Sequence, residues 1–227
     1  VNSVTTYDAE SLTYVINLVN TYTRIAHDLE IEKVWDGGIP VPITINLYRS
    51  IGLNGEKVLH DTVTLDGVVD SNSGSKEYAP YKYIWKNIDQ TSDNGDLYIY
   101  TIDELEVPVN FTKTINSDGR TITNKYTSPL IDVIVNKVWI AGPDTHPDIE
   151  LQLLRNGLPH LDKVTLVNGT LNYTFENLAL TDHNGVPYIY TVDEVNVPEN
   201  YTKTISEDGI TITNTYASPK TDITGVK

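Results

Sequence analysis

Hydrophobic and polar residues alternate one by one along many short segments of the chain, whereas no convincing amphipathic helix pattern occurs. In residues 132–139, for example, Val133, Val135 and Trp139 fall on one face of an extended strand, opposite Asp132 and Asn136. Threonine, valine, isoleucine and tyrosine, which favour strands, dominate the composition. The pattern predicts an all-β protein.

Turn signals that contain glycine separate these segments. Ser117-Asp118-Gly119 and Glu207-Asp208-Gly209 are typical of hairpin turns in which glycine adopts positive φ, and two further signals of this kind occur earlier, at 93–95 and 183–185. The turns divide the chain into two stretches of roughly 90–105 residues with about seven short strands each. This number of strands is typical of a small, Ig-like β-sandwich, so we expect two sandwiches in tandem.

An internal repeat supports this division. Residues 98–129 align with residues 188–219 without a gap, and 22 of the 32 aligned positions are identical. Self-similarity over such a distance indicates tandem modules. We place the first sandwich at residues 25–128 and the second at 129–218. The first contains an insertion, Val68 to Pro80, with a Gly/Ser run that predicts a flexible hairpin extension.

The ends of the chain are out of phase with these modules. Tyr7 stands thirteen positions before Asn20, as Phe111 does before Asn124. We therefore expect residues 1–24 to be the last strands of a preceding module. Residues 219–227 are expected to be a linker and the first strand of a following one. Either the chain is a slice of a longer array, or its terminal strands complete each other between chains.

Charge and composition exclude several function classes. The net charge of −15 argues against nucleic-acid binding. No apolar run is long enough to cross a bilayer. The chain has no cysteine, and its five histidines lack zinc-ligand spacing. We therefore predict no metal, no cofactor and no membrane contact.

Three polar residues in each module lie on the apolar faces of three different strands. The first set is Lys33, Glu104 and Asn124, and the second is Lys137, Glu194 and Asn214. Each asparagine follows its glutamate by 20 positions. Asp103 and Asp193 are neighbouring acids, but the alternation turns them outward.

Buried groups of this kind point to a specific chemistry. Burial disfavours both the charged lysine and the charged glutamate, so it lowers one pKa and raises the other. A neutral amine is a nucleophile, and a protonated carboxyl group can polarise an amide and move protons. The product would be a Lys–Asn isopeptide bond, formed with loss of ammonia. An ordinary buried polar network is the alternative.

The pattern KVW…ITINLYR…YxYTxDExxVPxNYT…DGxTITNTY resembles the Cna B-type repeat of Gram-positive surface adhesins and sortase-assembled pilins. The resemblance covers both modules, from about residue 25 to residue 218. It implies a Lys33–Asn124 bond promoted by Glu104 and a Lys137–Asn214 bond promoted by Glu194. Asn20 and Lys227 occupy the corresponding positions in the flanking segments, which suggests a link between modules or between chains.

These observations lead to a functional hypothesis and two alternatives. We expect an extracellular stalk or filament module of a cell-surface adhesin or pilus, with no activity on an external substrate. The first alternative is an adhesive module that recognises a host protein or glycan through loops or strand edges, with the 68–80 insertion as the favoured place. The second is head-to-tail assembly through the terminal strands.

Overall fold

The computed structural model describes residues 2–11, 13–19, 21–67 and 81–221. The chain divides into two compact units: the first comprises Val1–Asp36 and Pro40–Lys125, and the second Gly37–Ile39 and Tyr126–Lys227. All regular secondary structure in the described residues is β-strand. No helix in that part of the chain has the length and apolar character needed to span a bilayer.

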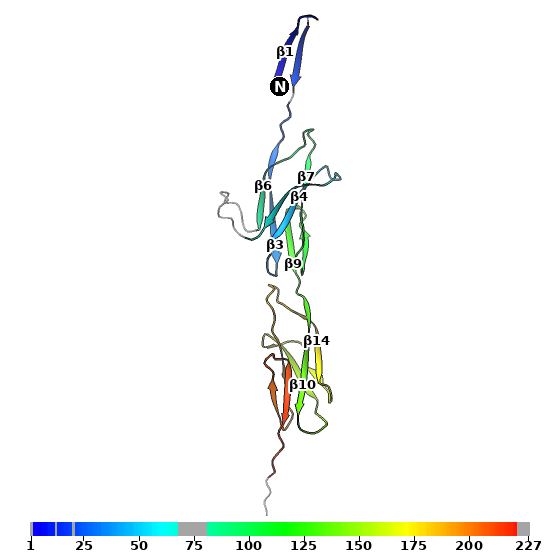
Figure 1. Ribbon diagram of the computed structural model, residues 1–227, viewed down its shortest axis with the longest axis vertical. Helices are drawn as coiled ribbons and strands as arrows, with labels where there is room; N and C mark the ends of the chain where they lie inside the picture. The colour runs from blue at the N-terminus through cyan, green and yellow to red at the C-terminus, as the bar shows by residue number, and fades with distance from the viewer. Residues whose placement is uncertain (1, 12, 20, 68–80, 222–227) are drawn as a thin grey trace, which may run out of the picture. The chain divides into compact units, whose positions relative to one another are not determined.

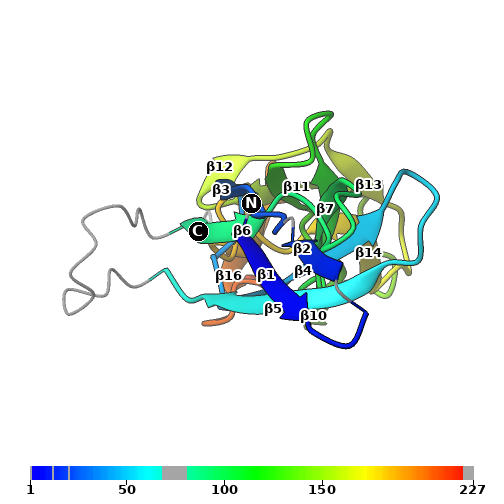
Figure 2. The same ribbon diagram turned by 90° about the horizontal axis from the view of Figure 1, so that it is seen from above.

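The first unit begins with a hairpin of β1 (Asn2–Asp8) and β2 (Thr13–Val19), drawn in dark blue in Figure 2. The strands pair in antiparallel register, with Tyr7 opposite Tyr14. Tyr7 is thus next to last in its strand, whereas Phe111 and Tyr201 each begin theirs. The assignment of residues 1–24 to a preceding module stays a prediction.

The rest of the first unit is a sandwich of two sheets. One sheet has the order β6-β3-β9-β8 and the other β5-β4-β7. The strands are β3 (Ala26–Asp36), β4 (Ile43–Ile51), β5 (Val58–Leu65), β6 (Lys82–Asp89), β7 (Tyr98–Glu104), β8 (Phe111–Ile115) and β9 (Thr121–Tyr126). The first strand of the sandwich, β3, lies parallel to the last, β9 (Figure 1). The pairs β3–β6, β4–β5 and β4–β7 are antiparallel.

The second unit repeats this topology. One sheet has the order β14-β10-β17-β16, and in the other β11 pairs with β12, β13 and β15. The strands are β10 (Leu130–Ile140), β11 (Ile149–Arg155), β12 (Leu158–Pro159), β13 (Val164–Leu166), β14 (Asn172–Ala179), β15 (Tyr190–Glu194), β16 (Tyr201–Ile205) and β17 (Thr211–Tyr216). Here the parallel pair of first and last strands is β10 and β17.

Each sandwich has its own hydrophobic core, to which both sheets contribute. In the first unit Ile31 of β3 and Ile122 of β9 pack in one cluster with Leu47 of β4. Val135, Leu153 and Ile212 belong to the corresponding cluster in the second. Every one of these side chains is at most 1% exposed. The all-β, Ig-like sandwich fold predicted from the alternation is therefore confirmed.

The hairpin turns before the last strands form as the sequence predicts. Gly119 has φ of 69° and Gly209 has φ of 75°, values that a residue with a Cβ atom adopts only at a cost. In each turn the glycine N–H donates to the carbonyl group three residues earlier, on Asn116 and on Ser206. These turns send the last strand back beside the first, which brings together the predicted site residues.

Candidate cross-linking sites

The parallel pair of first and last strands positions the lysine and the asparagine of the first unit. In the register of β3 and β9, Lys33 lies opposite Ile122, and Trp35 lies opposite Asn124. Lys33 and Asn124 are therefore diagonal neighbours, and they share the face that packs against the second sheet. Their side chains are 2% and 0% exposed.

The glutamate comes from the opposite sheet. Glu104 is the last residue of β7 and pairs with Ile45 of β4. Its carboxylate accepts a hydrogen bond from Asn124 Nδ2 at 2.8 Å through Oε1, and its Oε2 lies 3.6 Å from Lys33 Nζ. A single carboxylate thus contacts both the amine and the amide, across the interior of the sandwich.

The second unit contains the same arrangement. Lys137 lies opposite Ile212, Trp139 lies opposite Asn214, and Glu194 is the last residue of β15. Asn214 Nδ2 donates to Glu194 Oε1 at 2.9 Å, and Glu194 Oε2 lies 3.8 Å from Lys137 Nζ. The two sets therefore agree within 0.2 Å in both distances. In both units the inward orientation predicted for all three residues is confirmed by their burial.

Burial changes the acid–base properties of these groups. Loss of solvation lowers the pKa of Lys33 to about 8, although the Glu104 carboxylate opposes this shift. The pKa of Lys137 is lowered to about 8 for the same reason, against the opposing effect of Glu194. Burial also raises the pKa of Glu194, while its hydrogen bond from Asn214 lowers it. In the second unit the two changes together favour a neutral amine beside a neutral acid.

Each site leaves two buried oxygen atoms without a hydrogen bond. They are Glu104 Oε2 and Asn124 Oδ1 in the first unit, and Glu194 Oε2 and Asn214 Oδ1 in the second. Each glutamate Oε2 has only the ion pair with its lysine, and buried polar atoms without a hydrogen bond raise the free energy of the folded state, so they are rare in structural networks. The same atoms are unsatisfied in both sites, which makes this a property of the arrangement.

A tryptophan ring packs against each lysine amine. Lys33 Nζ lies 4.5 Å from the ring centre of Trp35, and Lys137 Nζ lies 3.9 Å from that of Trp139. A second ring packs edge-on against each tryptophan, from Phe111 in the first unit and from Tyr201 in the second. These rings exclude water from the amines, which strengthens the electrostatic interactions inside the site.

The neighbouring acids point outward, as predicted. Asp103 pairs with Lys113 of β8, and Asp193 pairs with Lys203 of β16. Each lysine also donates to the backbone carbonyl of the buried glutamate, at 3.3 Å to Glu104 and 2.9 Å to Glu194. Strand alternation alone does not single out these lysines. A signal for them existed, because the tripeptide Thr-Lys-Thr recurs at 112–114 and 202–204 inside the internal repeat.

The remaining predicted positions lie outside the described residues. Asn20 and Lys227 belong to this group, so their proposed link between modules or chains stays a prediction, and the 68–80 insertion belongs to it as well. In the part of the chain that the structure describes, His, Cys, Asp and Glu form no cluster of three or more suited to a metal ion.

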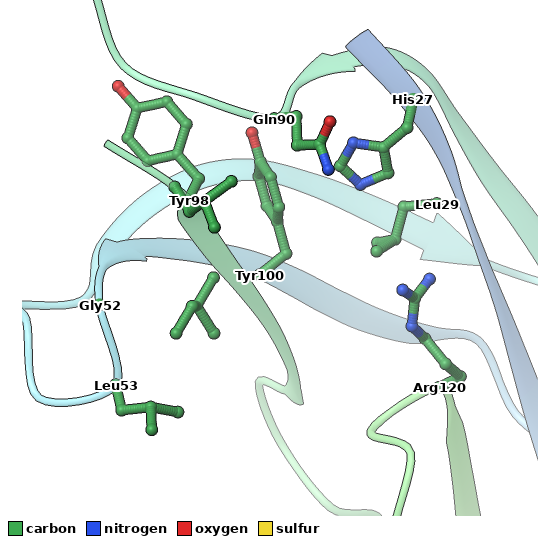
Figure 3. Close-up of a pocket in the computed structure, with 10 residues that line it drawn as sticks. His27, Leu29, Gly52, Leu53, Gln90, Tyr98, Tyr100 and Arg120 are labelled. Atoms are coloured by element: carbon green, nitrogen blue, oxygen red, sulfur yellow. The ribbon is translucent and has the colours of Figure 1, made fainter. Parts of the chain in front are cut away.

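A surface groove in the first unit is the other feature with binding potential. Its lining includes His27, Tyr98, Tyr100 and Arg120, drawn in Figure 3. Leu53, on the loop after β4, extends this lining and is 88% exposed. Leu97 of the same lining is 62% exposed, and exposed apolar side chains that form a contiguous patch mark surfaces that contact other molecules.

Comparison with known proteins identifies the family. A model of the Cna protein B-type domain matches residues 29–125 and 133–215. The chain belongs to this family. Domains of the Cna B-type are extracellular modules of Gram-positive cell-wall or pilus surface proteins, so the chain is extracellular and belongs to the cell surface. They are structural parts of adhesins and pili rather than enzymes.

Two similar proteins extend this result. A collagen adhesin of Staphylococcus aureus is 29% identical over 224 residues, which cover 92% of this chain and 17% of the adhesin. The crystal structure of two B repeat units of the collagen-binding protein Cna, also from S. aureus, matches with a TM-score of 0.51 and 23% identity. That match covers 90% of this chain and 57% of the other, and it shows a shared fold. The Cna B-type pair thus spans about a sixth of the length of the adhesin it matches.

Proposed function

We propose that this Cna B-type pair is a stalk module of a surface adhesin or pilus, and that each sandwich locks itself with an intramolecular Lys–Asn isopeptide bond. The bonds would join Lys33 to Asn124 and Lys137 to Asn214, with Glu104 and Glu194 as the promoting acids. The observation that supports this most directly is the burial, in both units, of an amine and a carboxamide that contact the same carboxyl group.

The reaction needs one proton shared between the lysine and the glutamate. With that proton on Glu104, the neutral Lys33 amine attacks Cγ of Asn124. A protonated carboxyl group can donate to Asn124 Oδ1 once the amide turns about its Cβ–Cγ bond, which would satisfy the oxygen that now lacks a partner. The resulting tetrahedral carbon carries both nitrogens.

Collapse of this intermediate releases ammonia. When the intermediate turns back to the orientation of the structure, its amide nitrogen lies beside Glu104 Oε1, and Oε2 faces the lysine nitrogen. The carboxylate can therefore take a proton from the attacking nitrogen and return one to the leaving nitrogen. The C–N bond of the asparagine breaks as the Lys–Asn bond forms, and no oxidant, metal or cofactor takes part in the balance.

Such a bond would suit a module that carries tension. It would connect the first strand of each sandwich to the last, so force applied at the two ends would pass through the covalent link and would not shear the strands between them. The chain has no cysteine, so the link would replace the disulfides that stabilise many exported domains. Neighbouring modules of the same protein are then the expected partners.

Peptide mapping of the purified chain tests this proposal. We expect two branched peptides, one joining the segments around Lys33 and Asn124 and one joining those around Lys137 and Asn214. An Asn124→Ala variant should lose the first branched peptide and keep the second. Only linear peptides from the wild-type chain would contradict the proposal.

The groove of the first unit favours a second candidate, direct adhesion. The adhesin and the Cna repeats named above belong to collagen-binding proteins, so collagen is the first probe to test. As a stalk the chain should not bind immobilised collagen. Binding that is lost in Leu53→Ser and Tyr98→Ala, but kept in the matched second-unit variant Tyr188→Ala, would favour adhesion.

A further inference from the structure

A lysine outside the buried site connects the two sheets beside each promoting glutamate. In the first unit it is Lys113 of β8, which pairs with Asp103 and donates to the Glu104 carbonyl group. In the second unit Lys203 of β16 makes the same two contacts, with Asp193 and with Glu194. The alternation explains this, because the acid that precedes an inward glutamate must face out, where a surface ammonium can reach it.

The lysine also stands next to the asparagine. In the register of β16 and β17, Lys203 lies directly opposite Asn214 and therefore shares its face of the sheet. Its ammonium group reaches the edge strand of the other sheet, which carries Glu194. One side chain thus links the strand that neighbours the amide to the strand that holds the acid.

Among the described residues no strand ladder joins the two sheets here, although in the second unit Val192 N–H of β15 donates to the Gly209 carbonyl group of the β16–β17 turn at 2.8 Å. β7 belongs to the sheet β5-β4-β7, and β8 belongs to the sheet β6-β3-β9-β8. Glu104 is the last residue of β7, and its pairing within the sheet is to β4 alone, at Ile45. The backbone just past the glutamate is held within its own sheet, by Leu105 N–H donating to the Thr44 carbonyl group at 2.9 Å, so the lysine adds a restraint from the facing sheet.

We propose that Asp103 and Lys113, and likewise Asp193 and Lys203, are positioning residues. Each ion pair holds the neighbouring glutamate, Glu104 or Glu194, in place for isopeptide bond formation. This inference rests on the proposed function. The lysine restrains the backbone of the glutamate through its carbonyl group, and the aspartate orients the lysine. The same contacts in both units, on residues separated by ten positions along the chain each time, indicate a common requirement of the two sites.

The charges of these ion pairs also act on the buried groups, with different effects in the two units. Burial is the main cause of the lowered pKa of Lys33, and the positive charge of Lys113 lowers that pKa further. Burial likewise raises the pKa of Glu194, and the charge of Lys203 acts against that rise while Asp193 adds to it. The ion pair therefore acts on the site without entering it.

An ordinary surface ion pair would have no effect on the reaction. The side chains of Lys113 and Asp103 are 23% and 53% exposed, and pairs in such positions contribute little to stability. What sets these pairs apart is the second bond, from the lysine to the glutamate backbone. The rate of bond formation therefore separates the two interpretations, because a surface pair would leave it unchanged.

The test follows bond formation in the full-length chain. Chain recovered unfolded from inclusion bodies is diluted from urea, samples are stopped in acid at intervals, and branched peptides of each unit are counted by mass spectrometry. We expect Lys113→Ala to slow the Lys33–Asn124 bond by about tenfold, since a small misplacement of a reacting group has effects of this size or larger. The Lys137–Asn214 bond in the same molecules is the internal control and should form at the wild-type rate.

Three further variants make the result decisive. Lys113→Arg keeps the positive charge and can donate to both acceptors, Asp103 and the Glu104 carbonyl group, so it should restore the rate. Lys203→Ala should slow the second bond alone. Asp103→Asn should slow the first bond without removing the lysine. Tryptophan fluorescence in the same samples reports folding, so the bond rate is compared among molecules that have folded.

Failure of the proposed function and failure of the positioning role give different results. If the wild-type chain forms neither bond, the proposed function fails and this inference fails with it. If the wild-type chain forms both bonds, and folded Lys113→Ala and Asp103→Asn form them at the wild-type rate, the proposed function stands and the positioning role is overturned. A slow Lys113→Ala that Lys113→Arg does not rescue would also overturn it.

Discussion

The two sandwiches agree closely at their buried sites and differ at one sheet edge. In the first unit β5 is a continuous strand of eight residues that pairs with β4. In the second unit the corresponding segment is divided into β12, of two residues, and β13, of three. Despite this difference, the lysine–glutamate and asparagine–glutamate distances agree within 0.2 Å.

The comparison shows which part of the fold the site depends on. The lysine and asparagine are set by the register of one parallel strand pair, and the glutamate by the end of one strand in the facing sheet. In the first unit β5 and the glutamate-bearing strand β7 lie on opposite sides of β4. In the second unit β12 and β13 lie on the opposite side of β11 from the glutamate-bearing strand β15. An edge strand can therefore change without moving the site, whereas a shift of one residue in the parallel pair would turn the lysine outward.

The largest expected difference between linked and unlinked units is mechanical. Single molecules pulled from both ends should show no extension from the segments between the linked residues. In Glu104→Gln the first unit should release up to about 300 Å, because Lys33 and Asn124 are 91 positions apart. Glu194→Gln should release up to about 260 Å from the 77 positions between Lys137 and Asn214. Equal extension of wild type and variants would mean that no covalent link bears the load.

Thermal stability should change next most strongly. Closing a loop of this size stabilises a folded domain by about 4–5 kcal/mol through the entropy of the unfolded chain. For a domain of about 100 residues this corresponds to about 20–35 °C in Tm. Calorimetry of Glu104→Gln and Glu194→Gln should show one transition lowered by this amount in each variant and the other unchanged. A shift of both transitions in a single variant would mean that the units are not independent in stability.

The pH dependence of bond formation should be bell-shaped in both units. The reactive pair holds one proton, so the rate should fall by about tenfold per pH unit above about 8, where that proton is lost. On the acid side the rate should fall once lysine and glutamate are both protonated. In the second unit this fall in rate should begin at a pH above the ordinary pKa of glutamate, because burial raises the pKa of Glu194. Refolding from urea in a series of buffers measures both limbs, and a rate that keeps rising above pH 9 would show that no acid is needed.

The smallest effect is expected from the insertion that distinguishes the first unit. Replacing residues 68–80, which lie outside the described residues, by a short turn should leave the Lys33–Asn124 bond intact. Shortening a loop twofold changes stability by only about 0.6 kcal/mol. Urea unfolding and the mass of the variant measure the two quantities. Loss of the bond would show that the insertion supports the site. That result would be unexpected, because the second unit has the same site and lacks the insertion.

Much of the fold and of the site arrangement could be predicted from the alternation. Strand positions, both glycine turns and the inward direction of Lys33, Glu104 and Asn124 follow from residue parity, because a strand side chain has only two directions available. Contacts between different sheets could not be predicted in this way. The pairing of Lys113 with Asp103 depends on how two edge strands approach each other, and parity within a strand carries no information about that.

The register of strand pairs also could not be predicted from the alternation of hydrophobic and polar residues. Tyr7 aligns by spacing with Phe111 and Tyr201, yet it lies next to the turn of its hairpin, since the register of two strands depends on the turn that joins them. The division of the β5 equivalent into β12 and β13 is a similar case. β12 has only two residues and both are exposed, and hydrophobic patterning specifies register only weakly in such a segment.

The most direct test of the central claim is the intact mass of the purified chain, measured beside the double variant Glu104→Ala, Glu194→Ala. The account predicts a wild-type mass that is lower than the sequence mass by two molecules of ammonia, and a variant with its full sequence mass. A wild-type chain with its full sequence mass would contradict the account, and the lysine, glutamate and asparagine of each sandwich would then form an ordinary buried polar network.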